Sequence, residues 1–155
     1  MVEVLFYHLT RRPLEQALPE LLEKTLERGW RGVVRAGSRE RAEALDAHLW
    51  TYRDEAFLPH GGPEDGPGDR QPIYLTAGEE TPNAPQIQFL VDGAETSIDK
   101  FAQYQRVILM FDGHDEQAVA TARGDWKAVS AAGFKAVYWA QDEAGRWVKK
   151  AESGG

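Results

Sequence analysis

Two cations and an indole lie close together in the chain, at Arg123, Trp126 and Lys127. Residues three and four apart lie on one side of a helix, so these side chains would share a helix edge. Guanidinium and ammonium groups donate charge-assisted hydrogen bonds to carboxylates, and an indole offers apolar area to another aromatic ring. The three residues are therefore suited to binding a short peptide that is both acidic and aromatic.

The surrounding chain predicts the helix that would position these residues. The apolar run at 107–111 is typical of a buried strand in a parallel sheet. An acidic turn at 112–116 favours a helix N-terminus, and Gly133 is a natural helix stop. Trp126 belongs to an apolar stripe at helical spacing, whose other members are Val119, Ala122 and Val129. A tryptophan in such a stripe is commonly a core residue with cations at its margin, so spacing alone leaves both interpretations open.

A second candidate surface lies where a predicted helix ends and a loop begins. Trp50 follows the apolar positions of that helix, and Phe57 comes shortly after it in the loop. Two large aromatics beside a proline resemble an interface anchor, although Phe57 would equally close over the helix end. The residues assigned to this second partner interface are Trp50, Phe57, Leu58, Pro59 and His60.

The common catalytic motifs are missing. The sequence has no cysteine, nucleophile elbow, phosphate-binding loop or dinucleotide fingerprint. Asp112, His114, Asp115 and Glu116 imitate a metal-binding turn, but a helix-capping turn explains the same residues with less. We therefore expect no catalytic residue, no metal and no cofactor. The remaining enzyme interpretation is a degenerate nucleotide-binding enzyme that uses the acidic turn at Asp112.

Charge and composition limit the possible partners. The chain of 155 residues carries a net charge of -7, whereas a DNA-binding surface must neutralise several phosphates. We expect little or no direct DNA binding, and no membrane span, because no apolar run approaches ~18 residues. A predicted C-terminal hairpin interleaves aromatics with cations, namely Trp139, Arg146, Trp147, Lys149 and Lys150. This hairpin could stack on single-stranded bases. A simpler explanation is that the tryptophans pack a sheet edge and the lysines keep that edge from pairing with another chain.

The order of the predicted elements indicates an α/β fold. A β-α-β-α opening implies parallel strands with right-handed crossovers. Pro13 suits the first position of the first helix, whereas Pro19 does not suit a helix interior. The helix therefore either starts near Pro13 and kinks at Pro19, or starts near Leu18. We expect a single domain over residues 1–150, with a mainly parallel central sheet, helices on both faces and a Rossmann-like three-layer arrangement. Residues 151–155 are expected to form a disordered tail. The predicted strands are 2–7, 30–36, 72–76, 86–91, 107–111, 135–140 and 146–150.

Three stretches together resemble the chi subunit of bacterial DNA polymerase III. The pattern Ala-Arg-x-x-Trp-Lys-Ala-x-x-x-Ala-Gly-Phe occupies residues 122–134. Phe6-Tyr7 at the end of the first strand also agrees with that family, as does Leu45–Trp50 followed by Phe57–His60. The order and spacing of the stretches match, and the similarity covers most of residues 2–140.

The resemblance implies a non-catalytic accessory subunit of the replisome, located in the cytoplasm at the nucleoid. Such a subunit links the clamp loader to single-stranded DNA-binding protein by binding the acidic C-terminal tail of that protein. By resemblance, Arg123 and Lys127 would bind the carboxylates of the tail, and Trp126 would help to form a wall for its terminal Phe. The region of Trp50 and Phe57 would receive a psi-like subunit or the clamp loader, and in this family it is also associated with an accessory helicase.

Overall fold

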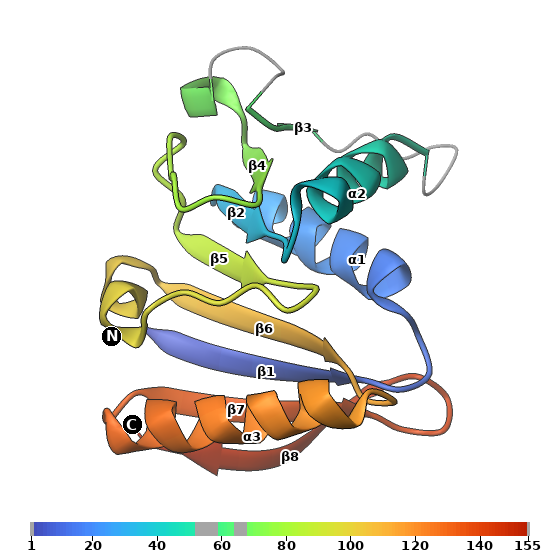
Figure 1. Cartoon of the computed structure of the whole chain (residues 1–155), viewed down its shortest axis with the longest axis vertical. Coiled ribbons are helices and arrows are strands. Elements are labelled where there is room, and N and C mark those ends of the chain that lie inside the picture. The colour runs from blue at the N-terminus through green and yellow to red at the C-terminus, as the bar shows by residue number, and fades with distance from the viewer. Residues whose placement is uncertain (1, 52–58, 64–67, 155) are drawn as a thin grey trace.

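The computed structural model describes residues 2–51, 59–63 and 68–154 of the chain. Within them, one eight-stranded sheet has helices on both of its faces, which confirms the predicted α/β fold (Figure 1). The strands are β1 (Glu3–Leu9), β2 (Gly32–Arg35), β3 (His60–Gly61), β4 (Ile73–Thr76), β5 (Ile87–Leu90), β6 (Arg106–Asp112), β7 (Lys135–Gln141) and β8 (Trp147–Ser153). The helices are α1 (Leu14–Glu27), α2 (Arg39–Thr51) and α3 (Glu116–Ala131), with short 3₁₀ helices η1 (Gly68–Arg70) and η2 (Ile98–Gln103).

The sheet is parallel except at one edge. The strand order is β3-β4-β2-β5-β6-β1-β7-β8, and among these described strands only the β7–β8 pair is antiparallel. α1 crosses from β1 to β2 and α3 crosses from β6 to β7, on opposite faces of the sheet (Figure 1). β1 and β6 are neighbours in the sheet, and the chain passes to one face of the sheet after β1 and to the other face after β6.

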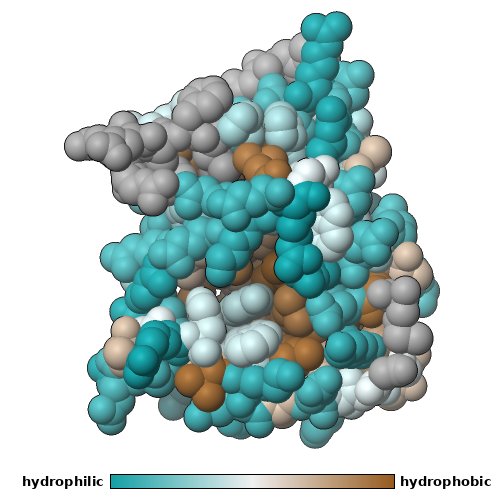
Figure 2. All heavy atoms as spheres, turned by 180° about the vertical axis from the view of Figure 1, so that it is seen from behind, coloured by the Kyte–Doolittle hydropathy of each residue, from teal (hydrophilic) through white to brown (hydrophobic). Residues whose placement is uncertain are grey.

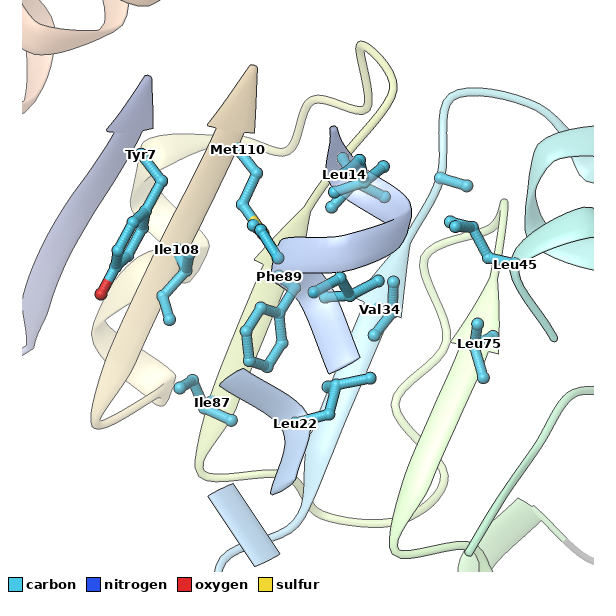
Figure 3. Packing of buried hydrophobic residues seen from close by; sticks show 14 of the residues in the cluster. Tyr7, Leu14, Leu22, Val34, Leu45, Leu75, Ile87, Phe89, Ile108 and Met110 are labelled. Atoms are coloured by element: carbon cyan, nitrogen blue, oxygen red, sulfur yellow. The ribbon is translucent and has the colours of Figure 1, made fainter. Parts of the chain in front are cut away.

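Each face of the sheet carries its own apolar core. The core under α1 and α2 includes Leu18 and Leu22 of α1. Leu22 lies beside Phe89 of β5 in this core (Figure 3). The core under α3 and η2 includes Phe6 of β1 and Val129 of α3. Two separate cores on one sheet are the expected result of burying a parallel sheet on both sides.

The structure resolves where α1 begins. Pro13 has extended backbone angles and stands immediately before the helix, which runs without interruption from Leu14 to Glu27 with Pro19 inside it. The predicted start near Pro13 is thus confirmed, with Pro13 at the N-cap instead of the first helical position, and the alternative start near Leu18 is wrong. Pro19 is buried among the side chains that α1 turns toward the sheet. Among the described residues, no helix is both long enough and apolar enough to cross a membrane.

The C-terminal strand extends past its predicted end at Lys150. Glu152 and Ser153 pair with Val137 and Ala136 of β7, so residues that we expected in a disordered tail belong to the sheet. Pairing with a buried neighbour holds this polar segment in place, although its own composition gives little sign of a strand. Residue 155 lies outside the described part of the chain.

Candidate functional site

α3 forms as predicted and carries the candidate residues. The Asp115 side chain accepts hydrogen bonds from the backbone N–H groups of Gln117 and Ala118, at 3.0 and 3.3 Å. Gly133 follows the helix with φ of +84°, the left-handed conformation that glycine adopts without strain. The helix packs over β6, β1 and β7 (Figure 1).

Trp126 is half-buried and belongs to an aromatic cluster between α3 and the sheet. Its ring meets Phe6 of β1 edge-on at 5.3 Å and Tyr138 of β7 at 5.9 Å between centroids. Phe6 and Tyr138 stack on each other at 6.2 Å. The indole thus has a core-facing part, as the apolar stripe predicts, while another part stays accessible at the surface.

Arg123 and Lys127 of α3 are both exposed. Within the described residues, neither makes a hydrogen bond or an ion pair, whereas most other arginines do. Arg123 and Lys127 thus keep their charges available to a partner, on a chain with a net charge of -7. The structure therefore brings the three predicted residues together at one accessible helix edge.

The structure adds two residues that sequence reasoning missed. His8 at the end of β1 and Tyr138 of β7 form a hydrogen bond of 2.7 Å between imidazole Nδ1 and phenol Oη. Burial lowers the pKa of His8, and the nearby positive charges of Arg123 and His114 lower it further. Burial raises the pKa of Tyr138, against the opposing effect of Arg123. The charge of Arg123 thus reaches the aromatic cluster beneath α3.

The second candidate surface is only partly described. Trp50 at the end of α2 is 53% exposed, and its ring lies 4.3 Å from the ring of His60. His60 is buried, and its Nε2 lies 2.9 Å from the backbone carbonyl oxygen of Asp46, to which it donates. Pro59 is half-buried, and Phe57 and Leu58 lie outside the described residues.

The acidic turn after β6 is engaged in local backbone contacts. The carboxylate of Asp112 accepts a hydrogen bond from the backbone N–H of His114 at 2.8 Å, and Asp115 caps α3. The His114 ring donates from Nε2 to the carbonyl oxygen of Thr10 at 2.7 Å. Across the described residues, no group of three or more potential metal ligands occurs.

A cleft of about 870 Å³ lies on the other flank of α3, at the carboxyl ends of β1, β5 and β6. Doubly wound folds bind nucleotides at this position, with phosphate on backbone N–H groups of the first βα turn. Here the N–H groups of Thr10, Arg11 and Arg12 donate to Oε1 of Gln141 at 2.9, 2.8 and 3.1 Å. A side-chain amide thus occupies the place of a phosphate, which argues against the nucleotide-binding alternative.

The tryptophans of the C-terminal hairpin pack against the sheet. Trp147 meets Tyr7 edge-on at 4.7 Å, and Nζ of Lys149 lies 6.0 Å from the ring centre of Trp139. Both indoles border the core under α1. Figure 2, which views the molecule from behind Figure 1, shows hydrophobic and near-neutral residues gathered around a hollow. The contacts fit the interpretation of a packed sheet edge better than that of an open platform for bases.

Fold and site together describe an α/β domain with an accessible cationic and aromatic helix edge. The family model described as "DNA polymerase III chi subunit, HolC" matches residues 1–137. A probable DNA polymerase III subunit chi from Rickettsia prowazekii (strain Madrid E) is 29% identical over 111 residues, 72% of this chain and 66% of the relative. The DNA polymerase III subunit chi of Escherichia coli (strain K12) is 26% identical over 121 residues, 78% of this chain and 81% of the relative. The match thus spans slightly less than two thirds of the Rickettsia protein. The chain belongs to the DNA polymerase III chi subunit family.

Proposed function

We propose that this protein is a non-catalytic accessory subunit that links the clamp loader of DNA polymerase III to single-stranded DNA-binding protein. The link is made by binding the acidic C-terminal tail of that protein at the α3 edge. The observation that carries the proposal is the exposed pair Arg123 and Lys127, which has no carboxylate partner within the described residues and lies beside the half-buried Trp126. Membership of the chi family supports the assignment to the replisome.

Each side chain has a distinct part in the proposed complex. Arg123 and Lys127 donate charge-assisted hydrogen bonds to the carboxylates of the tail. Trp126, held by Phe6 and Tyr138, offers the terminal Phe of the tail an aromatic wall. Edge-to-face aromatic pairs contribute about 0.5–1.5 kcal/mol beyond the area they bury. The complex therefore depends on a charged part and an apolar part, which respond differently to salt.

The second surface would bind a different partner. Trp50 is exposed and large, and buried aromatic anchors of this kind dominate many interfaces. We assign it, with Phe57, Leu58, Pro59 and His60, to a psi-like subunit or another part of the clamp loader, and to an accessory helicase where one is present. Trp50→Ala should release this partner from a pull-down and leave binding of the tail unchanged. Retention of every clamp-loader protein by the variant would argue against the assignment.

The tail site can be tested by calorimetry with a synthetic tail peptide and the same peptide lacking its last Phe. Lys127→Glu reverses a charge and should weaken binding more than Lys127→Ala. Loss of one charge-assisted hydrogen bond is worth roughly 1.5–3 kcal/mol, or about ten- to a hundredfold in affinity. Lys24→Glu is a matched control, because Lys24 is an exposed lysine near the end of α1, a helix on the opposite face of the sheet.

Two outcomes would place the site elsewhere. One is equal affinity for the two peptides, because the aromatic wall requires the terminal Phe. The other is equal loss of affinity in Lys127→Glu and Lys24→Glu, which would indicate a general effect of net charge. Salt should weaken the complex, because exposed charges are screened over about 10 Å at 0.1 M ionic strength. A salt-resistant part of the affinity should remain from burial of the Phe ring.

A further inference from the structure

We infer that β8 extends the tail-binding surface, with Val148 and Lys150 contacting the acidic segment that precedes the last residues of the tail. This inference rests on the function proposed above and enlarges the site by one strand. The match to the family model covers residues 1–137, so β8 lies wholly beyond the matched region. Membership of the family therefore does not account for the strand.

The register of β7 and β8 decides which side chains share a face with the site. Tyr138 points to the α3 face, where it contacts Trp126. Alternation along β7 places Ala140 on that face too. Val148 pairs with Ala140, and Ala151 pairs with Tyr138, and directly paired residues project to the same side of a sheet. Val148 and Ala151 thus continue the surface of Trp126 and Tyr138 outward to the edge.

This part of the α3 face is uncovered. α3 packs over β6, β1 and β7, and β8 lies beyond it at the edge of the sheet (Figure 1). Val148 is 37% exposed and is, apart from Trp50, the only large hydrophobic residue so exposed among those described. An exposed valine beside half-buried aromatics gives the outer part of the surface an apolar strip.

The charges of β8 favour an anionic occupant. Lys150 is the extra residue of a bulge, where the pairing shifts from Trp139–Lys149 to Tyr138–Ala151. It is exposed and has no ion pair within the described residues, whereas Lys149 pairs with Glu152 at 3.3 Å. Arg123 and Lys127 on α3 and Lys150 on β8 are thus exposed cations without an ion pair among the described residues, on the two elements that flank the apolar strip, in a chain that is acidic overall. An extended acidic peptide complements this pattern, and a nucleic acid would meet too few cations for firm binding.

Lys149 supplies a matched control one residue away. Lys149 lies opposite Trp139 in the register of the two strands, and Trp139 points to the face opposite α3. The Nζ of Lys149 lies over that indole. Lys149→Glu and Lys150→Glu change the net charge equally and alter neighbouring positions of the same strand. A difference between them would therefore report direct contact and not the overall field of the protein.

The experiment is calorimetry on the full chain with two synthetic tail peptides that share the terminal Phe, of about four and about ten residues. Lys150→Glu should lower affinity for the longer peptide by about two- to fivefold, in the range of exposed ion pairs, and leave affinity for the shorter peptide unchanged. Val148→Ser should weaken binding of the longer peptide at high salt as well as at low salt, because the contribution of Val148 is apolar. Lys149→Glu should change neither affinity.

The outcomes separate this inference from the proposed function. In one outcome, Lys127→Glu weakens binding of the shorter peptide, but Lys150→Glu and Lys149→Glu have equal effects on binding of the longer peptide. In that case the proposed function holds and β8 is not part of the site. An equal effect of Lys150→Glu on both peptides would likewise overturn the inference, because it would indicate long-range electrostatics. If neither peptide binds the wild-type chain, the proposed function itself is wrong.

Discussion

His48 of α2 donates a hydrogen bond from Nε2 to the backbone carbonyl oxygen of Glu15 in α1, at 2.7 Å. In a helix without proline, this carbonyl would accept a hydrogen bond from the backbone N–H of residue 19, but Pro19 has no N–H. The imidazole supplies the missing donor, which requires that its Nε2 carries a hydrogen. The proline inside α1 is thus accommodated by a side chain from the neighbouring helix, and the contact ties the two helices together.

His48→Ala is expected to destabilise the protein by about 1 kcal/mol or more, because it leaves the Glu15 carbonyl without its donor. Pro19→Ala restores a backbone N–H at that position, so His48→Ala should cost less in the Pro19→Ala background. A double-mutant cycle by urea unfolding measures this coupling. Additive effects of the two substitutions would show that the histidine does not replace the donor that Pro19 lacks.

Gln141 holds the β1–α1 turn through one oxygen atom. Three backbone N–H groups converge on its Oε1, and the residue is only 8% exposed. Gln141→Met keeps the shape of the side chain and removes the acceptor, so it should cost roughly 1–3 kcal/mol of unfolding free energy. Gln103→Met, at an exposed position in η2, is the control and should change stability little. A cost for Gln141→Met no larger than that of the control would mean that water replaces the amide.

Asp125 lines the cleft on the inner flank of α3. Burial raises the pKa of its carboxyl group, and the negative charge of Glu95 adds to the effect. Because the folded state binds this proton more tightly than the unfolded state, the ionised group destabilises the fold at neutral pH. Asp125→Asn should therefore raise Tm at pH 7. The gain in free energy of unfolding should be less than about 1 kcal/mol, because the site is partly solvated.

The gain from Asp125→Asn should disappear as pH falls below the ordinary pKa of aspartate, about 3.9, where the carboxyl is protonated in both states. Thermal unfolding of both proteins between pH 3 and 7 gives the comparison. Asp69→Asn, at an exposed position in η1, controls for the change in net charge. A gain that persists unchanged at the lowest pH would indicate that the effect does not come from ionisation.

Local sequence signals were enough to predict the helix that carries the candidate site. Asp115 caps α3 and Gly133 ends it, and both features depend on backbone chemistry within a few residues. The start of α2 is similar, because Oγ of Ser38 accepts a hydrogen bond from the backbone N–H of Arg41 at 3.2 Å. Side chains on one helix could therefore be placed together before the fold was known.

Features that depend on distant pairing could not be predicted. His8 and Tyr138 are 130 residues apart, and only the parallel neighbours β1 and β7 bring them together. The end of β8 was predicted too early because residues past Lys150 are held by pairing with β7.

The last prediction concerns the proton on His8. The charged groups that act on this imidazole are Arg123 and His114, which lower its pKa, and Asp112, which raises it; Tyr138 is its hydrogen-bond partner. Arg123→Ala removes one cause of the lowering, so the His8 pKa should rise toward its ordinary value. Lys127→Ala is the control, because Lys127 is not among the groups that act on His8.

NMR titration of the imidazole protons measures this shift directly and does not depend on any partner. Under the proposed function, a tail carboxylate paired with Arg123 would offset the same positive charge and also raise the His8 pKa. By linkage, the complex would then take up protons and tighten as pH falls through the His8 titration. The His8 pKa could instead be the same in the wild-type protein, in Arg123→Ala and in the peptide-bound protein. That result would show that Arg123 does not act on this imidazole, and tail binding would then have no expected link to the titration of His8.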